Sequence, residues 1–90
     1  MSETALVAKI RKALQSRGVY VAKMHGSQYM TAGLPDLWCV VAGRLVCLEV
    51  KLASEQPTQK QIVEMERLRR AGATTCVVRS VDDAIKAMGF

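Results

Sequence analysis

Two apolar runs joined by a very short connection constrain the fold of this chain more than any other feature of its sequence. Residues 37–41 and 45–50 are rich in valine, leucine and cysteine, and only Ala42, Gly43 and Arg44 separate them. β-Branched and apolar side chains favour strands, and a connection of this length joins antiparallel neighbours in a hairpin. Because both strand faces are apolar, other layers are expected to cover the hairpin on both sides. The sequence therefore predicts two central strands in a layered α/β domain.

A helix and a strand are expected before this hairpin. Ser2 is a suitable N-cap for a helix whose apolar side chains recur at helical spacing, and Gly18 provides a stop just past its last turn. Residues 19–24 have the composition of a first strand. Residues 25–35 then form an irregular, glycine-containing connection to the hairpin.

A second helix is expected after the hairpin and a polar loop at residues 52–57. Thr58 and Gln61 are three residues apart, which is the capping-box arrangement at a helix start, and Gly72 ends the helix. The buried stripe of this helix is predicted to consist of Ile62, Met65 and Leu68.

A fourth strand and a short helix complete the predicted chain. Residues 74–79 form the strand, which is parallel to the third if the helix between them makes the usual right-handed crossover. Ser80 and Asp83 form a second capping box, and the last helix stops near Gly89. The predicted order is αβββαβα, a four-stranded mixed α/β sheet flanked by helices, in a single domain spanning residues 1–90.

Composition narrows the functional classes. The chain has 90 residues and a net charge of +5, which favours a polyanionic partner such as nucleic acid. No apolar run approaches the roughly 20 residues that cross a bilayer, and the N-terminus lacks the character of a secretory signal. We therefore expect a cytoplasmic protein without a membrane partner. Cys39, Cys47 and Cys76 are an odd number without CxxC spacing, which predicts reduced core thiols.

Charged residues at the hairpin ends suggest the chemistry. If the hairpin loop has an even number of residues, Val41 pairs with Arg44 and Asp36 lies directly opposite Glu49. An odd loop would instead place the two carboxylates on different faces of the sheet. In the even register their Cβ atoms are about 4.5–5.5 Å apart, and two like charges so close are destabilising without a cation between them. Oxygen ligands of this kind are those that Mg²⁺ selects.

Strand alternation adds a lysine to this pair of carboxylates. Glu49 and Lys51 are two residues apart and therefore point to the same face. A lysine beside a bound metal can orient and help deprotonate an attacking water, or stabilise charge that grows on a phosphate. The backbone carbonyl of Val50 is a further candidate ligand. Glu3 lies on the inward stripe of the first helix, where a metal-ligand role and a helix-dipole role are equally compatible with its position.

Three sequence segments, taken together, resemble a known nuclease family. They are GLPD at residues 33–36, LEVK at 48–51 and TQKQ at 58–61. In an αβββαβ order they are similar to the VRR-NUC domain (virus-type replication-repair nuclease) of the PD-(D/E)XK, or restriction-endonuclease-like, superfamily. The PD and ExK residues alone match many sequences by chance, whereas the added glycine, the helix glutamine and the acidic residue in the first helix make the combination more specific.

The resemblance implies Mg²⁺- or Mn²⁺-dependent hydrolysis of DNA phosphodiesters. Transferred residue by residue, it assigns the metal to Glu3, Asp36, Glu49 and the carbonyl of Val50. It assigns catalysis to Asp36, Glu49, Lys51 and Gln61.

The resemblance also implies a substrate class and an assembly. Stand-alone members of the family, of the kind that phages and bacteria carry, resemble Holliday junction resolvases, which are homodimers that cut branched DNA. One small domain carries one site, and symmetric cuts in a four-way junction require a two-fold pair. Two alternatives remain open: a duplex-cutting nicking or restriction-type nuclease, and a non-catalytic nucleic-acid-binding or assembly module with the same fold.

Several residues outside the charged set are candidate DNA contacts. Lys23 can face the scissile phosphate from the end of the first strand, and His25 is either a phosphate contact or an ordinary loop residue. Ser27 and Tyr29 lie in the polar stretch before the hairpin, which is expected to touch DNA near the cut. The ERLRR cluster at residues 66–70 is either a solvated helix face or part of a phosphate-binding surface.

Overall fold

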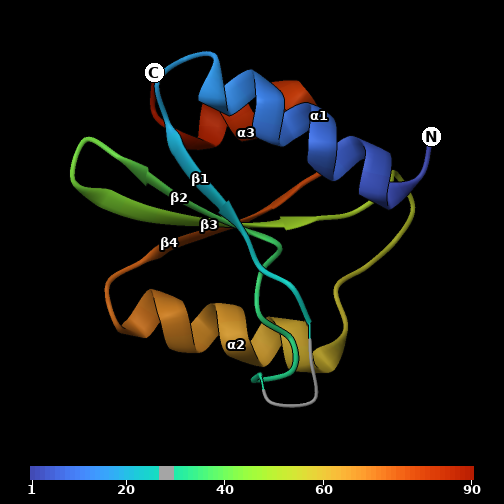
Figure 1. Cartoon of the computed structure of the whole chain (residues 1–90). Coiled ribbons are helices and arrows are strands. Elements are labelled where there is room, and N and C mark those ends of the chain that lie inside the picture. The colour runs from blue at the N-terminus through green and yellow to red at the C-terminus, as the bar shows by residue number, and fades with distance from the viewer. Residues whose placement is uncertain (27–29) are drawn as a thin grey trace.

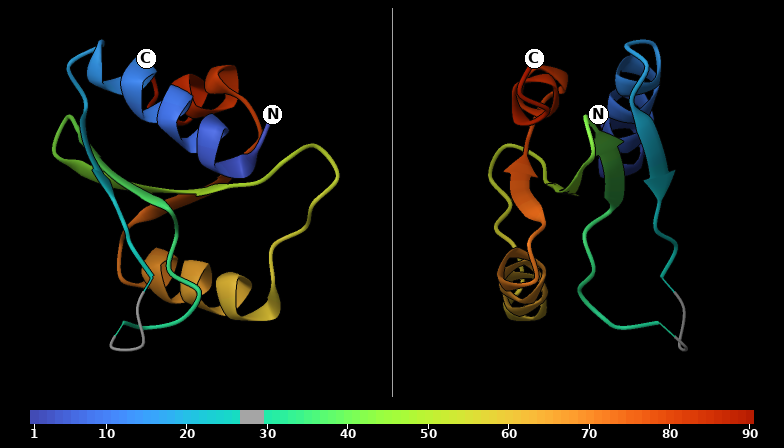
Figure 2. Two further views of the ribbon diagram at one scale, coloured as in Figure 1. Left: turned by 45° about the vertical axis from the view of Figure 1, so that its right-hand side comes forward. Right: turned by 90° about the vertical axis from the view of Figure 1, so that its left-hand side faces the viewer.

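The chain folds into a four-stranded mixed sheet with helices on both faces, as the sequence predicts. The computed structural model describes residues 1–26 and 30–90. Its elements are α1 (Glu3–Gln15), β1 (Tyr20–Lys23), β2 (Leu37–Val41), β3 (Arg44–Val50), α2 (Gln59–Arg70), β4 (Thr74–Val78) and α3 (Val81–Ala87). Figure 1 shows α1 and α3 on one side of the sheet and α2 on the other, and both views in Figure 2 agree.

The hairpin strands occupy the centre of the sheet. The strand order is β1-β2-β3-β4. β2 is antiparallel to both β1 and β3, and β4 is parallel to β3 after the crossover through α2. Val41 pairs with Arg44, so the even register is the correct one. Ala42 and Gly43 have φ angles of 49° and 75°. A type I′ turn requires positive φ at both positions, and its twist matches that of the flanking strands.

The hydrophobic core lies between the sheet and the α1–α3 pair. Completely buried side chains include Ile10 and Leu14 of α1, Leu48 and Val50 of β3, and Met88 after α3. Burying an aliphatic side chain of this size stabilises the fold by about 1.5–3 kcal/mol. The stability of the domain therefore comes mainly from this side of the sheet.

The cysteines belong to the interior of the sheet, as predicted. Cys39 and Cys47 are buried free thiols, and Cys76 is free and half-buried. Burial raises the pKa of Cys39 and of Cys47 to about 11. These two thiols therefore remain protonated near neutral pH and behave as small apolar side chains.

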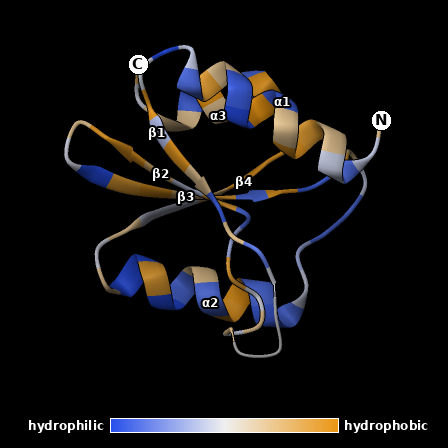
Figure 3. Ribbon diagram, in the orientation of Figure 1, coloured by the Kyte–Doolittle hydropathy of each residue, from blue (hydrophilic) through white to orange (hydrophobic). Residues whose placement is uncertain are grey.

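The α2 side of the sheet is less completely covered. Met65 is buried, but Ile62, predicted to share its buried stripe, is 48% exposed. At about 100° per residue, the contacting face is centred near Gln61, Met65 and Leu68, which turns Ile62 toward solvent. Figure 3 shows a largely hydrophilic α2 below orange strands. This side of the sheet is the one that can accommodate charged groups.

The helix starts follow the predicted caps with one difference. Ser2 and Thr58 cap α1 and α2, and the α2 capping box is complete. At α3, Ser80 Oγ accepts from the Asp83 N–H at 3.0 Å, but Asp83 Oδ2 accepts from the N–H of Arg79 rather than that of Ser80. The predicted α3 capping box is therefore only half formed, because the carboxylate caps the donor one residue earlier.

The helices are short. The longest helix in residues 1–26 and 30–90 is α1, with 13 residues. No helix in this described part of the chain is long and apolar enough to cross a membrane.

Candidate metal and nuclease site

Asp36 stands where the β2–β3 ladder ends. The last paired residues are Leu37 and Leu48, and the same register sets Asp36 opposite Glu49. The Asp36 Oδ2 atom accepts a hydrogen bond of 2.8 Å from the backbone N–H of Val50. The side chain thereby satisfies a strand donor beyond the end of the backbone pairing. Asp36 is thus fixed to β3 by its own carboxylate.

The loop before Asp36 packs against the start of α2 through Gly33. Gly33 has a φ of +86°, and a Cβ atom at this position would lie 2.6 Å from the backbone oxygen of Lys60. Glycine tolerates both the left-handed backbone and this close approach. Pro35 is buried in the same segment, and its carbonyl accepts a 3.2 Å hydrogen bond from Trp38 Nε1. The GLPD segment therefore has a packing role that fixes the position of Asp36.

Glu49 is a buried carboxylate without a hydrogen-bond partner. Its residue is 1% exposed, and within the described parts of the chain neither Oε1 nor Oε2 has a partner. Burial and then the charge of Asp36 raise the pKa of Glu49 to about 8, while Lys51 opposes the shift. Buried polar groups are nearly always hydrogen-bonded. An orphaned buried carboxylate therefore points to a partner that the protein itself does not supply.

Lys51 lies on the same face as Glu49, as strand alternation predicts. Its Nζ atom is 3.8 Å from Glu49 Oε2, and its side chain is 9% exposed. The Lys51 backbone N–H donates to the Val78 carbonyl at 3.0 Å, which ties this position to β4. The ammonium group therefore has a defined position beside the carboxylate.

The chain offers two carboxylates and a backbone carbonyl to a divalent cation. The Val50 N–H points toward Asp36, and the N–H and C=O of one strand residue point to the same side. The Val50 carbonyl is therefore directed toward Asp36, as a ligand role requires. Within residues 1–26 and 30–90, no three His, Cys, Asp or Glu side chains gather as a metal-binding group. Mg²⁺ commonly takes one or two carboxylates and keeps several waters, so this donor set fits it.

Glu3 faces Glu55 at the edge of the charged set. Partial burial and then a side-chain hydrogen bond with Glu55 raise the pKa of Glu3, which Lys51 partly offsets and Asp36 increases. The pKa of Glu55 is lowered, first by its hydrogen bond from the Leu52 N–H, which is 2.9 Å long at Oε1. The two carboxyl groups therefore lie beside each other at this edge. A ligand role for Glu3 stays a prediction, and Glu55 is a neighbour that the sequence did not reveal.

Arg79 fixes the loop that carries Glu55. Its Nη1 atom donates hydrogen bonds of 2.6 Å to the carbonyl oxygens of both Leu52 and Glu55. Arg79 follows β4, so the end of one strand holds the connection that leaves its neighbour β3. No local sequence signal marks these roles, because the contact of Glu55 with Glu3 and the contacts of Arg79 with the loop join residues far apart in the chain.

Gln61 acts as a helix cap in the structure. Its Oε1 atom accepts from the Thr58 N–H at 2.9 Å, and Thr58 Oγ1 accepts from the Gln61 N–H at 3.2 Å. Capping engages the amide oxygen, so in this rotamer the amide NH2 group is what Gln61 can offer a substrate. Its catalytic role stays a prediction.

The predicted DNA contacts lie in different places. Lys23 is half-buried at the end of β1 and lines a groove beside α1. His25 is exposed and lines a cleft of about 340 Å³ together with Asp36. Ser27 and Tyr29 lie outside the described residues.

The arginines of the ERLRR cluster are paired with glutamates of the same helix. Arg67 contacts Glu64 at 2.9 Å, and Glu66 contacts both Arg69 at 3.0 Å and Arg70 at 3.2 Å. These pairs neutralise most of the local positive charge. The structure therefore favours the interpretation of a solvated helix face over that of a phosphate-binding surface.

Comparisons with solved structures extend over almost the whole chain. One structure, described as "VRR_NUC domain", has a TM-score of 0.70 and 28% sequence identity, covering 91% of this chain and 92% of that one. Another, described as "VRR_NUC domain protein", has a TM-score of 0.81 and 18% identity, covering 99% of this chain and 86% of that one. No protein-family model matches the sequence, and a search of curated proteins gives no match.

Proposed function

Because the chain has the fold of a VRR-NUC domain, we propose that it is a divalent-metal-dependent endodeoxyribonuclease that hydrolyses phosphodiesters in branched DNA. The two structural likenesses confirm the predicted family resemblance and its restriction-endonuclease-like core. The proposed cofactor is Mg²⁺ or Mn²⁺. The proposed substrate is a four-way or similarly branched DNA, as for the Holliday junction resolvases that stand-alone members of the family resemble.

The observation that carries this proposal is the state of Glu49. A carboxyl group that is 1% exposed, has no hydrogen-bond partner in the described residues and lies opposite Asp36 is costly to ionise without a cation at that point. A purely structural domain would gain stability from an apolar residue there. The cost is understandable if the carboxylate is kept for metal binding.

The neighbouring groups can then be given roles in phosphodiester hydrolysis. When bound, the divalent cation supplies Lewis-acid activation of the phosphate and lowers the pKa of a bound water. Asp36, Glu49 and the Val50 carbonyl would hold it. Lys51 would orient the attacking water with its ammonium hydrogens, and its charge offsets the negative charge that develops on the phosphate.

A homodimer is part of the proposal. The described residues form one such charged set, whereas paired cuts in a four-way junction need two sites related by a two-fold axis. Sedimentation of the protein with and without a junction measures the assembly directly. A strictly monomeric protein that still cuts would retain the nuclease proposal and remove the paired-cut mechanism.

The deciding experiment is a cleavage assay on labelled four-way junction, flap and plain duplex DNA, with Mg²⁺, Mn²⁺ or EDTA. The wild type is compared with Lys51→Ala and Asp36→Ala. Lys86→Ala is the matched control, because it removes the same charge as Lys51→Ala from an exposed position on α3. We expect metal-dependent cutting of the junction by the wild type and the control, and a loss of at least about a hundredfold in the two site variants.

Two outcomes would change the assignment. Cutting of plain duplex as fast as the junction would replace the branched-DNA substrate with that of a nicking or restriction-type nuclease. DNA binding without cutting under every metal condition would favour the non-catalytic module instead.

A further inference from the structure

A basic groove runs between α1 and the edge strand β1. It has a volume of about 410 Å³, and its charged lining residues are Arg11 and Lys12 of α1 and Lys23 of β1. Among the described residues, no acidic side chain lines it. We call this feature the α1–β1 groove.

The cations of the α1–β1 groove differ from the α2 arginines in having no acidic partners among the described residues. Every arginine of the ERLRR cluster pairs with Glu64 or Glu66. In contrast, no ion pair within the described residues involves Arg11, Lys12 or Lys23. The groove therefore presents uncompensated positive charge, which favours an anionic partner.

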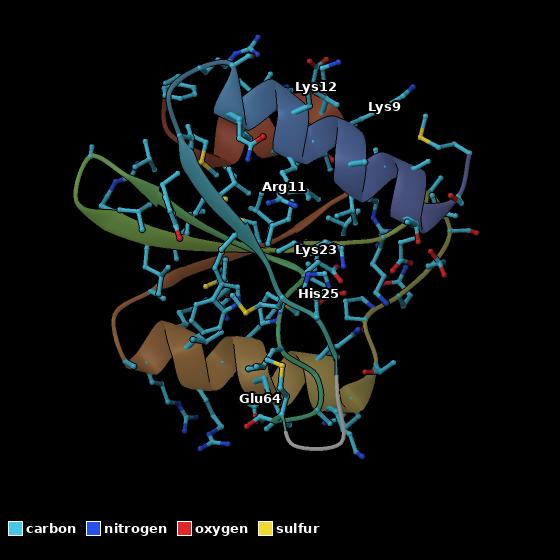
Figure 4. All side chains as sticks on the ribbon, viewed as in Figure 1. Lys9, Arg11, Lys12, Lys23, His25 and Glu64 are labelled. Carbon is cyan, nitrogen blue, oxygen red and sulfur yellow. The ribbon has the colours of Figure 1, made fainter. Side chains whose placement is uncertain are left out.

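The groove ends close to the candidate site. The N–H of Met24, the residue after Lys23, donates to the Asp36 carbonyl at 2.8 Å. Figure 4 shows Arg11, Lys23 and His25 following one another from α1 along β1 toward the connection that leads to β2. A chain of phosphates that passes Asp36 can continue along this row, where Lys23 and Arg11 supply the positive charges.

The remaining lining residues are the apolar Val7 and Ala8 and the polar Thr4 and Gln15, and the polar pair suits a nucleic-acid backbone. Thr4 and Gln15 line the groove together with Arg11, so hydroxyl, amide and guanidinium donors recur along one face of the helix. Such side chains make a large share of the phosphate and sugar contacts in protein–DNA complexes.

An anionic membrane is a poorer match for the same helix. A basic helix that lies on a membrane inserts an apolar face between the lipids. The apolar face of α1 is already used, since Leu6, Val7, Ile10 and Leu14 are all buried in the core. The groove offers charge and polar donors but no free apolar stripe.

We propose that the α1–β1 groove binds the phosphate backbone of the DNA that leaves the cleavage site. This inference rests on the proposed nuclease function and adds a binding surface that includes Arg11 and Lys12. The groove would position the DNA relative to Asp36 without taking part in the chemistry. The contacts are to phosphates, so they act equally on any base sequence.

The test measures DNA binding in EDTA, so that it does not depend on cleavage. Arg11→Gln/Lys12→Gln is compared with Arg67→Gln/Arg70→Gln, which removes the same charge from α2. The affinity for a fluorescent four-way junction is followed by anisotropy at several salt concentrations. Each lost phosphate contact reduces the slope of log affinity against log salt by about 0.9, so we expect a reduction of about 2 for the groove variant. Its affinity should fall on the order of tenfold, and the α2 variant should keep the wild-type slope.

Three results would overturn the groove assignment. Equal losses in both double variants would mean that only net charge matters. Wild-type binding by the groove variant would mean that DNA does not use this surface. If the groove variant lost the wild-type protein's binding to phosphatidylserine-containing vesicles while its DNA binding was unchanged, the groove would be assigned to a membrane. The charge-preserving exchange Arg11→Lys/Lys12→Arg should bind DNA as the wild type does, and circular dichroism checks that every variant is folded.

A parallel cleavage assay of the wild type in Mg²⁺ separates this inference from the proposed function. Groove-dependent binding by a protein that never cuts would keep the groove and remove the nuclease. Metal-dependent cutting by the wild type, with undiminished binding by the groove variant, would keep the nuclease and remove the groove.

Discussion

The two faces of strand β3 hold opposite kinds of buried side chain. Leu48 and Val50 face α1 and α3 and are completely buried in the apolar core, whereas Glu49 and Lys51 alternate with them and are 1% and 7% exposed on the α2 side. Burial of an aliphatic group stabilises a fold, but burial of a charged group costs free energy unless a partner compensates it. One strand thus separates a face that holds the domain together from a face that carries the groups of the proposed site.

The largest expected effect is on the chemical face. Lys51→Ala should reduce metal-dependent DNA cleavage by about 10²–10⁴-fold, the range over which a positioned proton-transfer group contributes. The free energy of unfolding should change much less, because Lys51 has no place in the apolar core. Cleavage rates and urea denaturation of the same preparations check this. If the unfolding free energy fell by as many kcal/mol as the activation free energy of cleavage rose, the distinction between the two faces would be lost.

On the core face, Leu48→Ala should have the opposite profile. Removing a completely buried leucine leaves a cavity, and we expect a loss of about 2–5 kcal/mol in the free energy of unfolding. At a temperature where the variant is still folded, its affinity for Mn²⁺ should be close to that of the wild type. Urea denaturation and calorimetric metal titration measure the two quantities. Comparable damage to metal binding would show that the two faces are coupled.

Glu49→Gln should change how stability depends on pH. The pKa of Glu49 is about 8 in the folded chain, against an ordinary value of 4.5. Between these two values the folded protein keeps a proton that the unfolded chain has released, so wild-type stability should fall as pH rises through this window. Below pH 4.5 the folded and unfolded chains both carry this proton, and the stability that the raised pKa contributes is fully present. The glutamine variant lacks the decline and should be more stable than the wild type near pH 8 in EDTA, by a few kcal/mol at roughly 1.4 kcal/mol per pKa unit.

The same pair of proteins tests the metal. Thermal unfolding between pH 5 and 9, in EDTA and then in excess Mg²⁺, should show that the cation stabilises the wild type and leaves Glu49→Gln unchanged. Parallel pH curves for the two proteins in EDTA would mean that Glu49 is not the buried acid that the structure describes.

Gly33→Ala tests the connection that positions Asp36. The added methyl group would meet the Lys60 backbone at 2.6 Å in a left-handed conformation, and we expect a cost of about 1–3 kcal/mol. Affinity for Mn²⁺, followed by electron paramagnetic resonance, should fall as Asp36 shifts. Gly26→Ala is the matched control, since a Cβ atom there meets nothing within 4 Å. Equal metal affinity in both variants would show that the Gly33 contact does not position Asp36.

The smallest effect is expected at the surface of α2. Arg70→Ala removes one exposed ion pair with Glu66 and should change the unfolding free energy by roughly 0.3–0.5 kcal/mol, less at high salt. Denaturation at low and high ionic strength measures this difference. A loss above about 1 kcal/mol would mean that α2 supports the sheet through more than the packing around Met65.

Much of the fold follows from short-range signals. The cap at Ser2, the capping box of Thr58 and Gln61 and the turn at Gly43 depend on neighbours within about four residues, so the order of elements could be predicted. The error at Ile62 has a different origin. Its three-residue spacing from Met65 suits a buried stripe, but the side of α2 that meets the sheet is set by the packing of the crossover, which spacing alone does not define.

The candidate site divides in the same way. The sequence by itself determined that Glu49 and Lys51 share a face, because alternation is a property of any strand, and it placed Asp36 opposite Glu49 once the hairpin loop was even. Only the tertiary structure decided that these groups are buried. It also brought Glu55 beside Glu3, and within the described residues it left Arg11 and Lys12 of α1 without acidic partners while the arginines of α2 are paired. Burial and charge pairing depend on which elements pack together, and that choice involves residues too far apart in the chain for any local pattern to fix.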